Sequence, residues 1–361
     1  MKYCVSVDWL AMYCKLPIVG FAETFSAFKH DCKRTWTIKA AEYGTRQFKF
    51  LHFVHLNGEE FAEVQSVPHS MILKKDSCIV RIVNRQLYTP TVFYDLQCFF
   101  DDFHIMPEGL SRCDLCADFN AFKDYDCVRF IKDFLASTIR HKGRGKGSAY
   151  FNHYAKNELG VSKSHVDYTG LAFGSRESDV RAYLYNKSWE LLTVKDKPYI
   201  RDLWRAAGLN VSKPVWRLEF SLHSKARKFK DKMTGKTKEI TRDDISDKHE
   251  LQKLYLTFVH KYWAFVKNRA NITNISREPT LNLFGLECYY LHTCLRDVSG
   301  GNRTERILIK QLWQMSETYR GDDCHTDEGV TKSIALALAE HTDLIDWFEK
   351  KTKVWEKPNR K

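Results

Sequence analysis

The sequence predicts an α+β fold, in which an antiparallel or mixed β-sheet core with flanking helices is followed by a mostly helical C-terminal region. Two patterns carry this prediction. Up to about residue 105, aromatic and β-branched residues alternate with polar ones, which is typical of strands. Beyond residue 224, apolar residues recur at helical spacing. We expect a β-rich domain over residues 1–224, a basic linker or hairpin over 225–245, and a mostly helical region over 246–361.

The same patterns place the individual elements. Early strands are expected at 35–40, 48–56, 78–83 and 91–94. Three more strand segments lie between about 110 and 224. Helices are expected at 125–141, 251–266, 303–319 and 331–355. The last helix has an apolar stripe, which fits packing within the chain or the seam of a homodimer.

Composition limits the partners. Lysine and arginine total 57 against 45 aspartates and glutamates, a net charge of +12, which favours nucleic acid or an acidic membrane surface. Eleven cysteines occur singly along the chain, which indicates reduced thiols and a cytoplasmic location. The N-terminal apolar stretch contains an aspartate and no long apolar run follows, so we expect neither a secretion signal nor a membrane partner.

Three strand segments carry more polar groups than a buried core would. Because side chains alternate between the faces of a strand, each segment has one polar face. These faces hold Arg112, Asp114, Cys116 and Asp118; Arg181, Tyr183, Tyr185 and Lys187; and Arg217, Glu219, Ser221 and His223. If the segments are neighbours in one sheet, the three faces converge. The alternative is that they are exposed faces of ordinary amphipathic strands.

Such a convergence supplies the groups that cleave a phosphodiester by transesterification. A phenol attacks phosphorus only when its anion is stabilised, and Lys187 is placed to do this. Asp114 and Glu219, with Asp118 as a third candidate, are hard oxygen ligands suited to Mg²⁺ or Mn²⁺. Arg217 offers a planar fork that matches phosphate oxygens.

The runs RCDLCADF, YTGLAFGSRESDVRAYLYNKSWE and WRLEFSLHSK, between about 110 and 224, resemble the replication initiation factor (Rep trans) family. That family contains rolling-circle plasmid initiators, phage initiators and relaxases of some conjugative transposons. The opening VSVDWL is a fainter match. The resemblance implies a divalent metal and a covalent 5′-phosphotyrosyl intermediate. It places the nucleophile on Tyr185 and the lysine on Lys187. Its acidic residues fall on Asp114 and Glu219, with Glu190 as a further candidate.

The identity of the nucleophile stays open within this resemblance. Tyr183 shares a face with Tyr185 and is an alternative nucleophile or a base-stacking residue; we favour Tyr185 because it directly precedes the Asn-Lys of the motif. The chain has neither a histidine-hydrophobic-histidine triplet nor Walker A spacing, so we expect a carboxylate-based nickase that depends on a host helicase. The plasmid members of the family suggest a homodimer.

DNA contacts are expected in basic segments interleaved with aromatic residues. Both basic segments could instead be solvated connectors. The candidates are Arg140, Lys142, Arg144, Lys146, Tyr150 and Tyr154 in the segment 138–156, Arg176 of the hairpin motif, and Lys228 and Lys230 in the stretch after 224.

The sequence therefore predicts a rolling-circle replication initiator that nicks one origin strand of DNA, binding single-stranded and origin duplex DNA, and later rejoins the ends. The alternatives are a relaxase for conjugative transfer, a hydrolytic nuclease and a non-enzymatic nucleic-acid-binding protein.

Overall fold

The computed structural model describes residues 1–16, 28–30, 34–70, 73–143, 147–158, 161–175, 178–226, 228–230, 235–269, 274–285 and 293–294. The chain divides into two compact units, Met1–Asp297 and Val298–Lys361, and every described residue belongs to the first. The helices expected at 303–319 and 331–355 lie outside the described residues.

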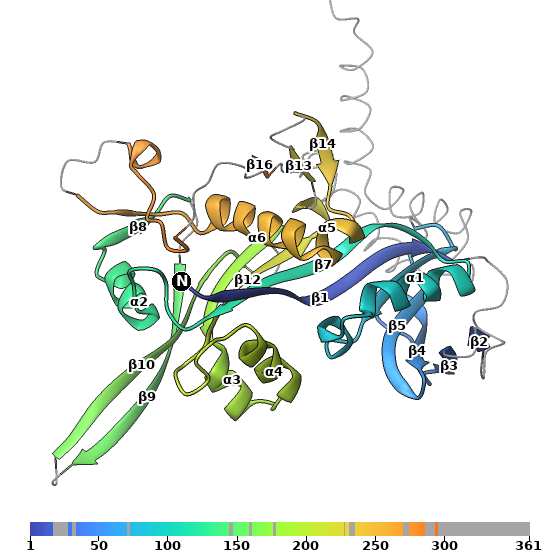
Figure 1. The fold of residues 1–361 in the computed structure, drawn as a ribbon, viewed down its shortest axis with the longest axis horizontal. Helices are drawn as coiled ribbons and strands as arrows, with labels where there is room; N and C mark the ends of the chain where they lie inside the picture. The colour runs from blue at the N-terminus through green and yellow to red at the C-terminus, as the bar shows by residue number, and fades with distance from the viewer. Residues whose placement is uncertain are drawn as a thin grey trace, which may run out of the picture. The chain divides into compact units, whose positions relative to one another are not determined.

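One large antiparallel sheet organises the first unit, with strand order β2-β3-β4-β5-β6-β1-β7-β12-β11-β10-β9 (Figure 1). Together with the flanking helices it confirms the predicted α+β class. Its strands are β1 (Tyr3–Lys15), β2 (Phe28–His30), β3 (Arg34–Ala40), β4 (Phe48–Leu56), β5 (Glu59–Pro68), β6 (Ser77–Ile82), β7 (Met106–Phe119), β9 (Gly147–Glu158), β10 (Val161–Phe173), β11 (Val180–Asn186) and β12 (Trp216–His223).

The two halves of this sheet follow the same path. β1 and β7 pair at the centre, and from each of them the chain runs to its own edge of the sheet. It then returns strand by strand, so that β6 pairs with β1 and β12 pairs with β7. Each half is followed by a helix. The sequence shows no internal repeat, so this duplication is visible only in the topology.

One face of the sheet carries the main hydrophobic core. The helices α1 (Val92–Asp102), α2 (Cys127–Leu135) and α6 (Lys248–Tyr262) contribute to it. Trp36 of β3 packs on Phe99 of α1 with ring centres 5.3 Å apart. Tyr255 of α6 packs on Phe220 at 5.5 Å and donates a hydrogen bond to the Leu218 carbonyl at 3.1 Å. These contacts hold α6 against β12.

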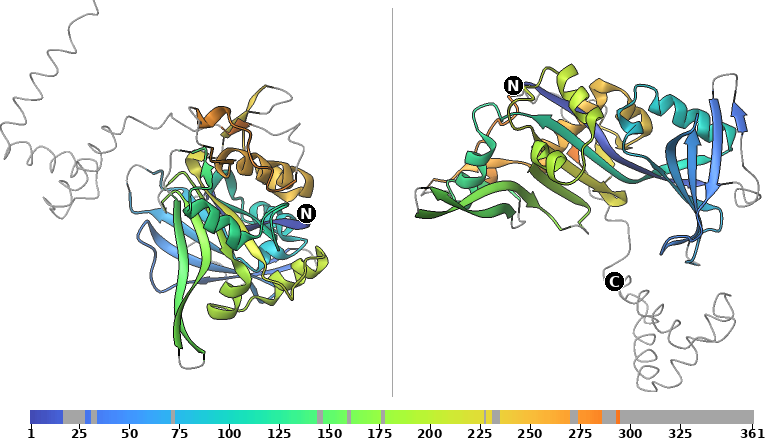
Figure 2. Two further views of the ribbon diagram at one scale, coloured as in Figure 1. Left: turned by 90° about the vertical axis from the view of Figure 1, so that its left-hand side faces the viewer. Right: turned by 90° about the horizontal axis from the view of Figure 1, so that it is seen from below.

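The opposite face is covered over β11 and β12 by α3 (Lys187–Thr193) and α4 (Pro198–Ala206), as Figures 1 and 2 show. The Asn186 side chain caps α3 by accepting from the Trp189 amide, and a proline begins α4 where no amide hydrogen is needed. A small cluster, separate from the main core, packs these helices: Leu191, Ile200, Trp204, Leu209 and Val215.

Smaller elements complete the described part. Beside the large sheet lie β8 (Ile139–His141) paired with β15 (Phe265–Lys267), and the set β13 (Lys228–Lys230), β14 (Thr237–Glu239) and β16 (Thr293–Cys294). The short helices are η1 (Gln86–Tyr88), η2 (Ser224–Ala226), α5 (Arg242–Ser246) and η3 (Ile275–Arg277). Among the described helices, none has the length and apolar content needed to span a bilayer.

Three element predictions need correction. The strand expected at 91–94 is the start of α1, because the apolar spacing continues through Leu96 and Phe99 into the core. The helix expected at 125–141 ends at Leu135: Ser137 has a φ of 58°, which stops the helix, and 139–141 forms β8. The helix expected at 251–266 ends at Tyr262, and 265–267 is β15.

Candidate active site

The three polar segments are adjacent strands, because β7 pairs with β12 and β12 pairs with β11. Their registers align the polar side chains in rows across the sheet, and the expected convergence of the three faces is confirmed. We call this side of the sheet the polar face. Its rows are Tyr185, Arg217 and Asp118; Tyr183, Glu219 and Cys116; and Arg181, Ser221 and Asp114.

A bulge in β1 adds a further carboxylate to the polar face. The register of β1 against β7 shifts between Val7 and Trp9. An extra residue in a strand changes the alternation of faces at that point, so Asp8 and Trp9 are both on the polar side. Asp8 forms an ion pair with the Arg217 guanidinium at 2.6 Å. The VSVDWL segment thus reaches the same cluster as the other three motifs.

The Tyr185 hydroxyl contacts both a carboxylate and an ammonium group. It donates to the Glu219 Oε2 at 3.0 Å and receives the Lys187 Nζ at 3.5 Å. The sequence predicted Lys187 on the same strand as Tyr185. In the structure it is the first residue of α3. It is 1% exposed and forms an ion pair with Glu190 at 2.7 Å. The phenol oxygen therefore lies between a carboxylate and an ammonium group.

Burial and charge set the proton affinities of this pair. Burial raises the pKa of Tyr185 well above its usual value, the charge of Glu219 raises it further, and Arg217 opposes both. Burial together with Asp114 and Asp8 raises the pKa of Glu219 to about 7, against the opposing charges of Arg217 and Lys187. Glu219 can therefore take up and release a proton near neutral pH.

Tyr183 lies beside Tyr185 as part of an aromatic stack. The two rings are stacked with centres 4.6 Å apart, and Tyr150 of β9 meets Tyr183 edge-on at 5.4 Å. The Arg181 guanidinium lies 4.9 Å from the centre of the Tyr183 ring and reaches the Tyr150 hydroxyl at 3.4 Å. Tyr150 is 40% exposed. The Tyr183 ring is thus packed between the Tyr185 ring and the Arg181 guanidinium.

Gly170 makes room for that stack. A Cβ at this position would lie 2.9 Å from the Tyr183 ring and 2.7 Å from the Leu184 carbonyl oxygen. Gly170→Ala is therefore expected to destabilise the protein by about 1–3 kcal/mol through overpacking, measured by urea unfolding. Ser148→Ala, on exposed β9, is the control and should stay within about 0.5 kcal/mol of wild type. Equal stabilities for the two variants would contradict this explanation.

Arg217 does not occupy the position of a phosphate clamp. It is fully buried, and its guanidinium donates to both Asp118 oxygens at 2.6 and 2.8 Å. It also donates to the Tyr88 hydroxyl at 3.2 Å. Burial opposes its charge, but Asp118 and Asp8 outweigh that and raise its pKa above the usual value. The predicted clamp residue is thus part of a buried ionic network that joins β12 to β7 and β1.

The three carboxylates predicted as metal ligands do not form one site. Asp118 is fully buried, and both its oxygens accept from Arg217, while Trp204 donates to it at 2.7 Å. Asp114 and Asp118 are four residues apart on β7, about 13 Å along a strand. Within the described residues, no group of three His, Cys, Asp or Glu side chains is arranged to hold a metal ion.

Asp114 and Glu219 remain as a two-carboxylate candidate. They are diagonal neighbours on paired strands, within reach of one ion, and Mg²⁺ needs few carboxylates when a phosphate supplies further oxygens. Asp114 is 4% exposed and accepts from Arg112 at 3.0 and 2.6 Å and from Ser221 at 2.7 Å. The carboxylate oxygens of this pair suit a hard cation, and a bound ion would share Asp114 with Arg112.

The predicted DNA-binding residues are scattered. Arg140 and Lys142 lie at β8, where Lys142 donates to the Ser276 carbonyl at 3.3 Å. Lys228 and Lys230 lie on β13, which belongs to a separate three-stranded sheet and not to the sheet of the tyrosines. Of the set, Tyr150 is the residue that contacts the aromatic stack. The remaining candidates lie outside the described residues or side chains: Arg144, Lys146, Tyr154 and Arg176.

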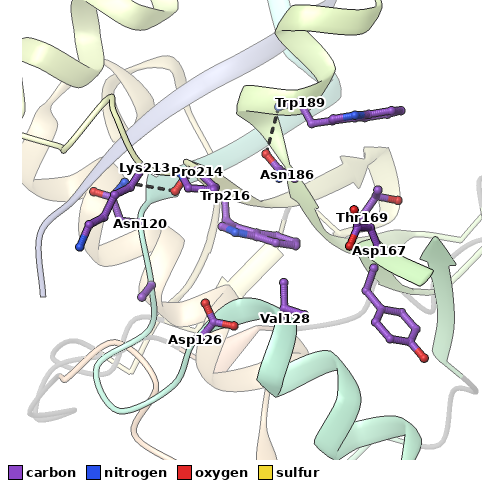
Figure 3. Close-up of a pocket in the computed structure, with 12 residues that line it drawn as sticks. Asn120, Asp126, Val128, Asp167, Thr169, Asn186, Trp189, Lys213, Pro214 and Trp216 are labelled. Atoms are coloured by element: carbon purple, nitrogen blue, oxygen red, sulfur yellow. Dashed lines mark hydrogen bonds between the residues drawn. The ribbon is translucent and has the colours of Figure 1, made fainter. Parts of the chain in front are cut away.

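A pocket of about 450 Å³ lies at the C-terminal end of β11, where Asn186 lines it (Figure 3). Trp189 and Trp216 line it, and the carboxylate of Asp126 and the amide of Asn186 each cap a helix. It contains none of the tyrosine or carboxylate side chains of the polar face.

Sequence reasoning missed Asp8, Tyr88 and Trp204, which complete the Arg217 network. The aspartate-tryptophan pair in VSVDWL was the available signal for Asp8. Tyr88 and Trp204 come from segments without a motif, so only the packing of η1 and α4 reveals them.

Comparison with known proteins gives matches in structure alone. No protein family model matches the sequence, and no curated protein matches it. One structural neighbour is a rolling circle replication initiator protein from Geobacillus stearothermophilus, at 13% identity and a TM-score of 0.44. The alignment covers 80% of this chain and 99% of that chain.

Proposed function

We propose that this protein is a DNA nickase that initiates rolling-circle replication by attaching the 5′ end of the cut origin strand to Tyr185. The observation that carries the proposal is the placement of one phenol oxygen between the Glu219 carboxylate and the Lys187 ammonium. A base on one side and a cation on the other are what a tyrosine needs to act as a nucleophile.

In the proposed reaction the Tyr185 oxygen attacks the scissile phosphorus while its proton passes to Glu219. The bond between phosphorus and the 3′ oxygen breaks, and that oxygen takes a proton from water to become a free 3′ hydroxyl. Lys187 stabilises the developing phenolate, which burial otherwise disfavours. Because the phosphotyrosyl bond conserves the phosphodiester linkage, a 3′ hydroxyl can attack it in reverse and rejoin the ends.

Mg²⁺ or Mn²⁺ belongs to the proposal as a cofactor. Asp114 and Glu219 would hold the ion on the polar face. A divalent ion bound there would polarise the scissile phosphate and favour departure of the 3′ oxygen. A host helicase would supply the unwinding, and the plasmid initiators in the resembled family make a homodimer the expected assembly.

The experiment incubates the protein with single-stranded oligonucleotides tiled over the DNA flanking its own gene, each labelled at the 3′ end. The proposal expects a labelled, protease-sensitive band on a denaturing gel that requires Mg²⁺ or Mn²⁺ and disappears with EDTA. Cut DNA without an adduct would identify a hydrolytic nuclease instead. Binding without any cut would leave a non-enzymatic DNA-binding protein.

Glu219→Gln is expected to slow adduct formation by about 100-fold, because the amide keeps a hydrogen bond to Tyr185 but cannot accept its proton. The measurement is a single-turnover time course of the labelled adduct. Glu250→Gln on α6, where the side chain is 42% exposed, is the control and should react at the wild-type rate. A Glu219→Gln rate within about threefold of the control would remove Glu219 from the proposed mechanism.

A further inference from the structure

The polar face continues past the nucleophile into the first half of the sheet. Arg112 of β7 pairs with Ala11 of β1, and Ala11 pairs in turn with Arg81 of β6. Trp9 lies in the neighbouring row, opposite Asp114. The guanidinium carbons of Arg81 and Arg112 each lie 4.7 Å from the centre of the Trp9 ring. One indole ring thus holds two guanidinium groups in fixed positions.

Both guanidinium groups retain donors for a ligand. Arg112 uses two nitrogens on Asp114, and Arg81 uses two on Glu63. A guanidinium has five N–H donors, so each arginine keeps N–H groups that do not bond to its carboxylate partner. The side chains of Arg112 and Arg81 are 37% and 30% exposed. These donors can therefore meet an anion from solvent.

The sheet is open on this side. On β5 and β6, the residues that face the core are buried, with Val64 at 0% and Val80 at 1% exposure. Their neighbours on the polar face, Gln65 and Ile79, are partly exposed. In the described part of the chain, α1 packs on the core side of these strands. A partner can therefore approach the polar face over β1 and β6.

We propose that this surface binds the single-stranded DNA that continues from the scissile phosphate. We call it the arginine track, formed by Arg81, Trp9 and Arg112 and continuing to Arg181 and Tyr183. This proposal of DNA binding rests on the proposed nickase function. The track crosses from β6 to β11, four strand spacings or about 19 Å. The arginines contact phosphates, while the Trp9 and Tyr183 rings hold the guanidinium groups in position. The remaining guanidinium N–H donors and the continuity with Tyr185 favour a DNA strand over a second copy of the chain.

The test measures the affinity of a fluorescent oligothymidylate across a range of salt concentrations, using Tyr185→Phe protein so that no adduct forms. Arg81→Gln is expected to weaken binding about tenfold and to lower the slope of log affinity against log salt by about 0.7 for each phosphate that the variant no longer neutralises. Trp9→Leu should weaken binding and leave the slope unchanged. Glu63→Gln, which removes the carboxylate that shares Arg81, should tighten binding.

Arg129→Gln is the matched control, since Arg129 also lies over an aromatic ring, that of Tyr125 at 5.8 Å, and pairs with Asp133. It removes the same charge from α2 and should change neither affinity nor slope. If Arg81→Gln behaves like Arg129→Gln, the arginine track is wrong. Changed slopes without any adduct in the wild-type protein would retain the track and reject the nickase. Unchanged slopes with a normal adduct would reject only the track.

Discussion

Tyr185→Phe is expected to abolish the covalent DNA adduct, whereas Tyr183→Phe should retain it within about tenfold of the wild-type rate. The hydroxyl that contacts Glu219 and Lys187 belongs to Tyr185, so its removal deletes the attacking oxygen. Tyr183 contributes a ring to the stack, and phenylalanine keeps that ring. The measurement is the yield and rate of the 3′-labelled adduct on a denaturing gel.

Peptide mapping of the adduct gives an independent readout, because the labelled DNA should remain on the peptide that contains Tyr185. Tyr168→Phe on β10 is a control that removes a phenol oxygen outside the Glu219–Lys187 contact. If Tyr183→Phe alone eliminates the adduct, the reaction class stands and the nucleophile is Tyr183. If both single variants still form the adduct, neither tyrosine of β11 is the sole nucleophile.

Arg217→Met is expected to lower the free energy of unfolding by about 3–5 kcal/mol, because it leaves Asp118 and Asp8 as unpaired charges in a buried network. Urea unfolding monitored by circular dichroism measures the change. Arg129→Met, at a side chain that is 74% exposed, is the control and should alter stability by less than about 0.5 kcal/mol.

If Arg217→Met does not fold, Trp204→Phe tests the same network more mildly. It removes one hydrogen bond to Asp118 while keeping an aromatic ring in the α3–α4 cluster, and stability should fall by about 1–3 kcal/mol. Wild-type stability in both variants would show that the Arg217–Asp118 pair does not support the sheet. A phosphate clamp at Arg217 would instead predict weakened DNA binding at unchanged stability.

The path of the chain sets the context for these residues. The two halves of the sheet follow similar paths, with six strands in the first half and five in the second. Among the described residues, the tyrosine–carboxylate–lysine contact occurs in the second half. At the matching strands of the first half, Glu63 and Arg81 form an ion pair instead. The proposed arginine track begins at this ion pair and crosses β1 and β7 to reach β11 of the second half.

The sequence by itself determined which side chains share a face. Period-two alternation grouped Asp114, Glu219 and Tyr185 correctly, because the geometry of a strand fixes the direction of each side chain from its position alone. The motifs also indicated that the strands carrying them belong together. Alternation could not reveal the register between strands, which depends on hydrogen bonds between segments about a hundred residues apart.

Only the tertiary structure decided which polar residues of that face meet solvent. Asp118 and Arg217 share the face of Tyr185, but α3 and α4 cover their end of it, so they pair with each other and lose access to a ligand. The bulge at Asp8 and the turn from β11 into α3 at Lys187 interrupt the alternation that the sequence pattern assumes. Burial and register arise from contacts between distant segments, and a local pattern contains neither.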